Sequence, residues 1–233
     1  MAKARWTWLV VAALVGAAGC EDDGDDNGGG PDDETPAGEV PGFGKNRNAP
    51  KGTPFSLPAG IQVVSATLKG ANDDGDCAGD ETDPAGSGLY VRACIEVKNP
   101  TGAPVQVVFP PGLVLVSATE TYQNGILVER EVITIPPTSN GPGGFDGGSE
   151  SETVSIPLHF YCINKSADPS DEFARFELGP VTDHPKMREI FSALEGKDIS
   201  NQRDPVEAVQ EAVFSITDGN GLTEDDRAAL RNL

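Results

Sequence analysis

The sequence predicts a mainly β protein, an immunoglobulin-like β-sandwich over residues 53–180 followed by two to three helices over residues 181–233. Two patterns indicate this order. Segments rich in β-branched and aromatic residues recur between clusters of Pro, Gly and Asn, which is the spacing typical of a β-sandwich. Beyond residue 180 the apolar residues recur instead at intervals of three and four, the period of a helix. The part from Thr53 onward is long enough for one domain with a sizeable core.

The strands are predicted where β-branched and aromatic side chains lie between turn residues. They cover residues 61–69, 89–98, 105–109, 113–117, 126–135 and 153–163. The segments between them contain strong breakers such as Pro110-Pro111-Gly112 and Asn124-Gly125. Each predicted strand is therefore bounded by residues that favour turns.

The helices are predicted in three segments. The first covers residues 184–194. In the second, Asp204 is a suitable N-cap with Pro205 at the first helical position. Its apolar residues follow at spacings of three and four: Val206, Val209, Val213 and Ile216. The third opens at Thr223, which forms an approximate capping box with Asp226.

The N-terminus has the pattern of an export signal. Lys3 and Arg5 precede an apolar run over residues 6–15, and small residues then lead to Cys20. A basic start, a short apolar run and small residues indicate a signal peptide over residues 1–19, and the run is too short for a stable membrane-spanning helix. The pattern resembles the lipobox of bacterial lipoproteins, with Ala17 where that family most often has Leu. The resemblance implies cleavage before Cys20, acylation of Cys20 and a lipid anchor; the alternative is an ordinary cysteine of a secreted protein.

Residues 20–52 are predicted to form a disordered, acidic and Gly-rich tether, because the stretch from Glu21 to Glu34 has nothing that could seed a core. The chain as a whole carries a formal net charge of −20. Such a surface repels phosphate backbones and anionic lipid heads, so nucleic acid is excluded as a partner. The partners we expect are the lipid bilayer, through acylated Cys20, and an unknown surface or envelope protein or glycan.

The cysteines other than Cys20 are odd in number, which leaves one thiol unpaired in an oxidising compartment. Alternation along the predicted strands separates them. Cys94 shares the polar face of its strand, whereas Cys162 shares the apolar face of the strand that ends at residue 163. An immunoglobulin-like disulfide between Cys94 and Cys162 would need both side chains to face the core, so the sequence favours a disulfide between Cys77 and Cys94 that closes a Gly- and Asp-rich loop. Cys162 is left as a small buried residue.

Gln210 is an unusual residue for its predicted position. On the second helix it lies beside Val209, within the arc that faces the core, so its amide needs a partner. The surrounding sequences, Phe160-Tyr161-Cys162 and Val209-Gln210-Glu211-Ala212-Val213-Phe214, resemble two signatures of bacterial surface thioester domains: an aromatic-Cys motif and a Gln-x-Ala-apolar-Trp motif, here with Phe in place of Trp.

That resemblance implies an internal thioester in which Cys162 supplies the sulfur and Gln210 the acyl carbon, with loss of ammonia. Such a bond must be buried, because water would otherwise hydrolyse it. Attack by an amine or hydroxyl of a target would then attach the protein covalently to its partner, as an adhesin does. The alternative is a related domain without the bond, in which Gln210 is hydrogen-bonded to backbone.

Other chemistry is weakly indicated. The acidic segment over residues 72–83 could gather calcium ligands, but Gly70 stands where an EF-hand has its first acid, so a solvated loop is the default prediction. His159 lies on a polar strand face and His184 at a helix start, and neither belongs to a nucleophile or metal motif. Convergence of Tyr161, Asp183 and His184 is the one arrangement that would favour a hydrolase. The sequence predicts no enzyme, no metal site and no cofactor.

Two classes of function follow from these residues. The first is a lipid-anchored binding or structural module of the bacterial cell envelope, with the outer membrane or cell surface favoured. The second is a reactive adhesin that uses Cys162 and Gln210. They differ in the state of the thiol: the first leaves Cys162 free, whereas the second leaves an electrophilic thioester.

Overall fold

The computed structural model describes residues 40–78, 82–138, 153–200 and 202–233. The predicted signal peptide 1–19, Cys20 and the predicted tether up to residue 39 lie outside the described residues. Asp80 and Glu81 of the acidic segment also lie outside them.

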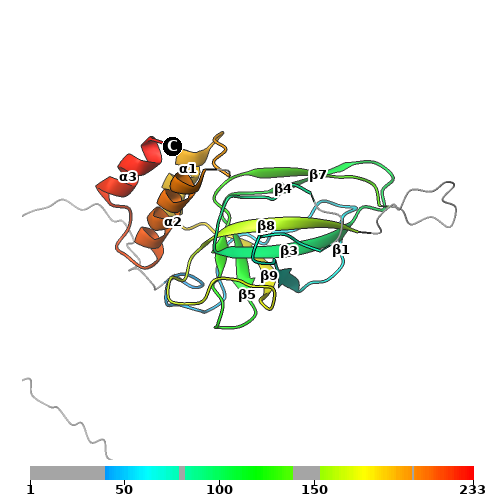
Figure 1. Ribbon diagram of the computed structural model, residues 1–233, viewed down its shortest axis with the longest axis horizontal. Helices are drawn as coiled ribbons and strands as arrows, with labels where there is room; N and C mark the ends of the chain where they lie inside the picture. The colour runs from blue at the N-terminus through cyan, green and yellow to red at the C-terminus, as the bar shows by residue number, and fades with distance from the viewer. Residues whose placement is uncertain (1–39, 79–81, 139–152, 201) are drawn as a thin grey trace, which may run out of the picture. The chain divides into compact units, whose positions relative to one another are not determined.

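The described residues form nine strands and then three helices along the chain (Figure 1). The strands are β1 (Gln62–Val63), β2 (Leu68–Gly70), β3 (Val91–Lys98), β4 (Val105–Phe109), β5 (Leu113–Ser117), β6 (Gly125–Ile126), β7 (Glu131–Ile135), β8 (Val154–Cys162) and β9 (Arg175–Val181). The protein is thus mainly β with C-terminal helices, as predicted.

The main sheet closes into a barrel of six described strands, where the sequence predicted an immunoglobulin-like sandwich. Its strands follow the order β3-β2-β9-β5-β6-β8, and β8 pairs back onto β3. This antiparallel closure runs from Val91 opposite Phe160 to Val97 opposite Val154. Burial alternates along β3, whose inward side chains from Val91 to Val97 are buried. The interior of the barrel is therefore filled by packed side chains. β1 is outside the closed ring of strands and pairs with β3.

A separate two-stranded sheet, β4 with β7, packs onto this core. The two strands pair in register, with Val105 opposite Ile135 and Phe109 opposite Glu131. Val107, Phe109 and Ile135 belong to the same buried cluster as the barrel residues. The predicted strand over residues 126–135 is therefore two strands in two sheets. Alternation fails where they meet, because Leu127 and Val128 are both buried.

Two other strand predictions differ from the structure. The segment predicted as one strand over residues 61–69 contains two short strands, β1 and β2. β9, which lies between β2 and β5 in the barrel, was not predicted from the sequence. By contrast, β4 and β5 have the bounds that the sequence predicted.

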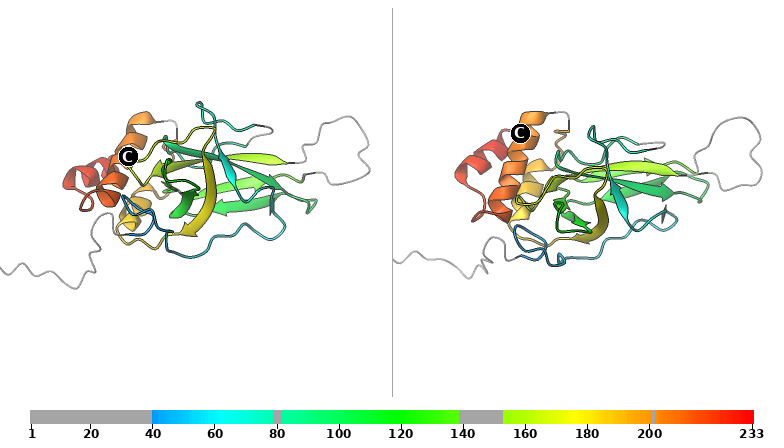
Figure 2. Two further views of the ribbon diagram at one scale, coloured as in Figure 1. Left: turned by 90° about the horizontal axis from the view of Figure 1, so that it is seen from below. Right: turned by 60° about the horizontal axis from the view of Figure 1, so that its bottom comes forward.

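The helices α1 (Met187–Leu194), α2 (Arg203–Thr217) and α3 (Glu224–Arg231) gather at one end of the barrel (Figure 2). Their apolar faces form a second buried cluster with barrel residues that point outward, among them Val114 and Tyr161. The predicted N-cap of α2 is wrong. Gln202, in extended backbone, precedes the helix, and Pro205 lies in its first turn, where its missing N–H removes no intrahelical bond.

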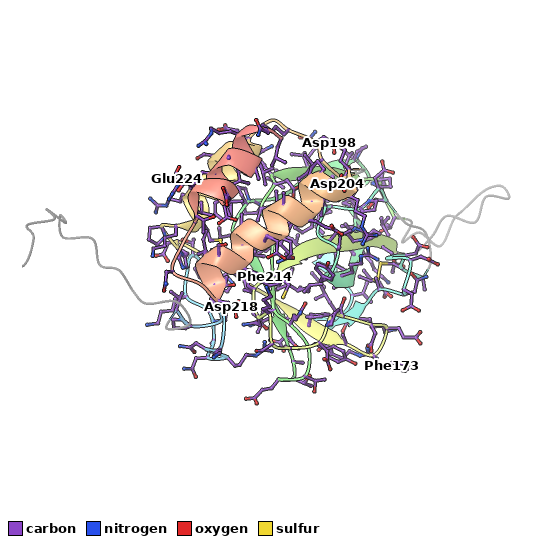
Figure 3. All side chains as sticks on the ribbon, turned by 60° about the vertical axis from the view of Figure 1, so that its left-hand side comes forward. Phe173, Asp198, Asp204, Phe214, Asp218 and Glu224 are labelled. Atoms are coloured by element: carbon purple, nitrogen blue, oxygen red, sulfur yellow. A yellow bond between two sulfur atoms is a disulfide. The ribbon has the colours of Figure 1, made fainter. Side chains whose placement is uncertain are left out.

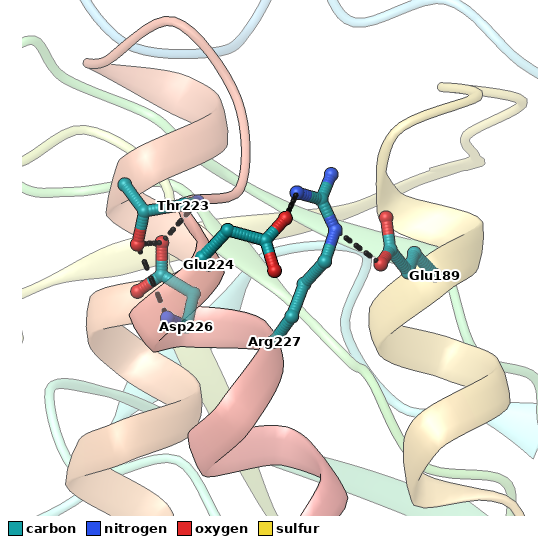
Figure 4. A network of polar contacts seen from close by, with 5 residues as sticks. All are labelled: Glu189, Thr223, Glu224, Asp226 and Arg227. Atoms are coloured by element: carbon teal, nitrogen blue, oxygen red, sulfur yellow. Dashed lines mark hydrogen bonds and ion pairs between the residues drawn. The ribbon is translucent and has the colours of Figure 1, made fainter.

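The start of α3 confirms the predicted capping box. The Thr223 hydroxyl accepts a hydrogen bond from the Asp226 N–H at 3.1 Å, and the Asp226 carboxylate accepts one from the Thr223 N–H at 2.7 Å. In the next turn Arg227 donates to Glu189 of α1 at 2.8 Å and pairs with Glu224 at 3.2 Å (Figure 4). This exposed network links α3 to α1.

The segment before residue 53 is part of the fold. Phe43 is 1 % exposed and packs in the cluster beneath the helices. The Gly44 N–H donates to the Ile163 carbonyl at 2.7 Å, and the Asn164 side chain donates to the Gly44 carbonyl at 2.7 Å. Gly42 has a positive φ of 87°, and a Cβ there would meet Pro50 at 2.7 Å, so the position requires glycine. The folded unit therefore extends N-terminally beyond the predicted boundary at residue 53.

Candidate functional site

Cys162 and Gln210, which the sequence singled out, are in direct contact. The Cys162 N–H donates to Gln210 Oε1 at 2.9 Å, and Gln210 Nε2 donates to the Cys162 carbonyl at 2.9 Å. Gln210 is 2 % exposed and Cys162 is fully buried. The Gln210 side-chain amide thus joins α2 to the end of β8 through two hydrogen bonds, which we call the clamp. These two bonds supply the hydrogen-bond partners that a buried glutamine amide needs.

The side chain of Cys162 belongs to the barrel core, against which Phe214 of α2 also packs. Val209 and Val213 of the same helix belong to the cluster between barrel and helices. Sγ accepts the Asn164 N–H at 3.4 Å. Burial raises the pKa of the Cys162 thiol to about 12, so it is protonated at neutral pH and is a poor nucleophile.

A small cavity opens beside the clamp. It has a volume of about 320 Å³ and is lined by Tyr90, Glu207, Ala208, Gln210 and Glu211. Figure 3 looks at the helical end, with α2 in front and Phe214 toward its C-terminal end. At Phe214, where the thioester signature has Trp, the Lys165 ammonium lies 4.8 Å from the ring centroid. The Gln210 amide therefore borders a cavity, and a cation–π contact lies in the next turn.

The predicted disulfide between Cys77 and Cys94 is confirmed. It ties the acidic loop to β3, with the two Cα atoms 5.7 Å apart. In the same loop the Gly75 carbonyl lies 3.2 Å from His159 Nε2 of β8. Burial lowers the pKa of His159, which keeps its ring neutral at physiological pH.

A second buried polar group lies at Glu129, in the link between β6 and β7. Ser87 Oγ hydrogen-bonds to Glu129 Oε1 and lies 2.7 Å from the Tyr161 hydroxyl. Glu129 is 7 % exposed, and within the described chain its Oε2 has no hydrogen-bond partner. The sequence analysis did not predict a buried carboxylate at Glu129. Its one signal was an acidic residue placed directly after the apolar residues Leu127 and Val128.

Glu129 lines a groove of about 1010 Å³ between the barrel and the helical end. Ser87, the β6–β7 link, His159 and the end of α1 with the loop after it form its walls. Burial raises the pKa of Glu129 to about 7; the Ser87 hydrogen bond partly offsets this, and the neighbouring charge of Glu131 adds to it. Burial also raises the pKa of Glu131. Figure 3 labels Asp198, which lines the groove in the loop before α2.

Tyr161 and His184, which the sequence considered together, have different recorded contacts. The Tyr161 hydroxyl lies 2.7 Å from Ser87 Oγ, whereas the His184 ring packs on Phe43 with their centroids 5.4 Å apart. The described residues contain no cluster of three or more His, Cys, Asp or Glu side chains arranged to hold a metal ion. Within the same residues, no helix has the length and apolar character needed to span a membrane.

No protein-family model, curated protein or solved structure matches this chain.

Proposed function

We propose that this chain is a lipid-anchored, extracytoplasmic binding module of the bacterial cell envelope. The observation that carries the proposal is the Cys77–Cys94 disulfide, because disulfides persist mainly in oxidising compartments outside the cytoplasm. The export pattern before Cys20 accounts for the address and the anchor. The groove beside Glu129 offers a concave, partly apolar site of the size that small ligands occupy. A surface protein or glycan remains the alternative class of partner.

The address is tested with the full chain expressed in a bacterial host, as wild type and as Cys20→Ser. We expect the wild type to sediment with membranes and its first peptide to begin at an acylated Cys20. The Cys20→Ser protein should carry no acyl chains, whereas a matched Cys162→Ser control should keep the acyl chains and the membrane association. A wild type without acyl chains, or acyl chains that persist in Cys20→Ser, would refute the anchor.

A thioester adhesin is the second candidate, and the contact between Gln210 and Cys162 beside an open cavity favours it. In that reaction the Cys162 S–H bond and the Gln210 carbon–nitrogen bond break, a sulfur–carbon bond forms, and ammonia leaves with the thiol proton. A target amine would then take the acyl group and return the proton to sulfur. The barrel-core position and raised pKa of the thiol favour the clamp instead.

Intact mass measurement of the full chain carrying Cys20→Ser distinguishes the two, under non-reducing conditions, before and after methylamine. The thioester requires a mass short by one ammonia that rises by methylamine, and both changes must vanish in Cys162→Ser and in Gln210→Ala. A mass that corresponds to one disulfide, with no ammonia lost and no adduct, excludes the thioester and leaves the clamp as the role of Gln210.

A further inference from the structure

We infer that the groove beside Glu129 binds a small organic cation, whose protonated amine pairs with the Glu129 carboxylate while its carbon chain lies along the apolar part of the groove. This names the ligand class of the proposed binding module and rests on that binding function. It does not depend on the lipid anchor.

The hydrogen-bond chain at the groove leaves an acceptor without a donor. The Ser87 hydroxyl has one proton, which it donates to Glu129 Oε1. In its contact with Tyr161 the Ser87 oxygen is therefore the acceptor, and burial, which raises the pKa of Tyr161 well above its usual range, keeps the proton on the phenol. Oε2 of the Glu129 carboxylate, in a side chain 7 % exposed, has no partner among the described residues. A buried acceptor in this state favours a ligand that brings an N–H donor.

The charges around the groove select the sign of that ligand. Carboxylates outnumber cationic side chains in its lining: Asp83, Glu129, Glu131, Glu195 and Asp198 against Arg130 and Lys197. A cleft lined mainly by one sign of charge concentrates ligands of the opposite sign. The lining therefore attracts an ammonium group and repels an anion.

The rest of the lining suits a carbon chain. Pro84, Pro111, Val128, Phe191 and Leu194 supply apolar surface in the same groove. Its volume of about 1010 Å³ is at the upper end of the range for small-molecule sites, which leaves ample room for an aliphatic amine. Oε2 itself is buried in this structure, so the Glu129 carboxylate must rotate about its terminal torsion to meet the amine, and that torsion is soft.

Release of a proton on binding distinguishes an ion pair between the ammonium and Glu129 from attraction to the acidic lining of the groove as a whole. Because Glu129 has a pKa of about 7, part of its population is protonated near neutral pH, and an ammonium bound beside it favours the ionised form. The titratable and charged groups that share its surroundings are Glu131, His159, Tyr161, Asp83, Glu195, Asp198, Arg130 and Lys197. Of these, His159 is kept neutral and Tyr161 protonated by burial. Binding at or slightly below neutral pH should therefore expel a proton from Glu129.

The test is calorimetric titration of the full chain carrying Cys20→Ser with cadaverine, a five-carbon diamine, and with pentanediol, its uncharged counterpart. We expect cadaverine to bind at least about tenfold more tightly than pentanediol, and Glu129→Gln to weaken cadaverine binding about tenfold to a hundredfold. The matched control is Glu177→Gln, an exposed carboxylate of β9 outside the groove, which should bind as the wild type does. Titrations in buffers of different ionisation enthalpy should show proton release in the wild type and none in Glu129→Gln.

Equal binding of the diamine and the diol would overturn the inference, and so would a Glu129→Gln variant that keeps wild-type affinity and proton release. Thermal unfolding monitors the fold of each variant; Glu129→Gln removes a buried charge and is expected to fold. Failure of this test leaves the anchor proposal standing, because acylation of Cys20 is measured separately.

Discussion

Tyr161 and Cys162 are neighbours in β8, and each belongs to a different buried polar site. The two sites differ in whether all of their polar atoms have hydrogen-bond partners. Cys162 packs in the barrel core and its backbone is paired with both amide atoms of Gln210. Tyr161 packs on the helical side and begins the chain through Ser87 to Glu129, which ends on an oxygen without a described partner. A saturated group suits a structural role, whereas an unsaturated one beside a groove suits binding.

The largest effect is expected when the saturated site is broken. Gln210→Ala leaves the Cys162 N–H and carbonyl unpaired inside the protein, at about 1 to 3 kcal/mol for each group. We expect a loss of about 4 kcal/mol in the free energy of unfolding, measured by urea denaturation of the full chain carrying Cys20→Ser.

The matched control is Glu211→Ala, the next residue on α2, which is exposed and lies 3.9 Å from Lys165. Its loss should cost less than about 1 kcal/mol, as for other surface ion pairs. A Gln210→Ala protein as stable as the control would mean that the clamp does not hold α2 on the barrel.

The clamp was the more predictable of the two sites. Alternation along one strand placed Cys162 on the buried face and Cys94 on the polar one, and helical periodicity placed Gln210 toward the core. These are local patterns, and the same patterns predicted the disulfide and the capping box. Barrel closure is not local: β3 and β8 pair across a long sequence separation, and sequence alone does not report which edges meet.

Glu129 was missed for a related reason. The prediction of one continuous strand over residues 126–135 assumed a single alternation, but the chain passes between two sheets after Val128. Phe43 was missed because it is a lone aromatic residue in a segment rich in Gly and Pro, and its burial depends on helices far along the chain. Both residues owe their burial to tertiary contacts.

The next effect concerns the unsaturated site and its pH dependence. The pKa of Glu129 is about 7 in the folded protein, against an ordinary value of 4.5 in an unfolded chain. Between these pH values the folded state binds more protons than the unfolded state, so stability falls as pH rises. The stabilisation is fully present below pH 4.5 and lost above about pH 7. We expect this group to contribute a fall of about 3 kcal/mol in the free energy of unfolding.

The measurement is the free energy of unfolding of the wild type minus that of Glu129→Gln at several pH values, so that other titrating groups, including Glu131, largely cancel. The difference should decline through the window from pH 4.5 to about 7. A difference that is flat across that window would mean that Glu129 is solvated, and it would remove the contrast with the clamp.

The smallest loss of stability is expected when the Cys162 thiol is removed. Its size distinguishes a structural clamp from a thioester as the role of this site. If the clamp acts through the backbone of Cys162, Cys162→Ala keeps both hydrogen bonds to Gln210. It loses a small buried side chain and the weak Asn164 N–H contact to Sγ, together about 1 kcal/mol. A thioester makes the opposite demand, because Cys162→Ala and Gln210→Ala then remove the same covalent link and should destabilise the protein to similar extents. Urea denaturation of both variants beside the wild type measures the difference. A Cys162→Ala protein much closer in stability to the wild type than to Gln210→Ala assigns the site to backbone pairing.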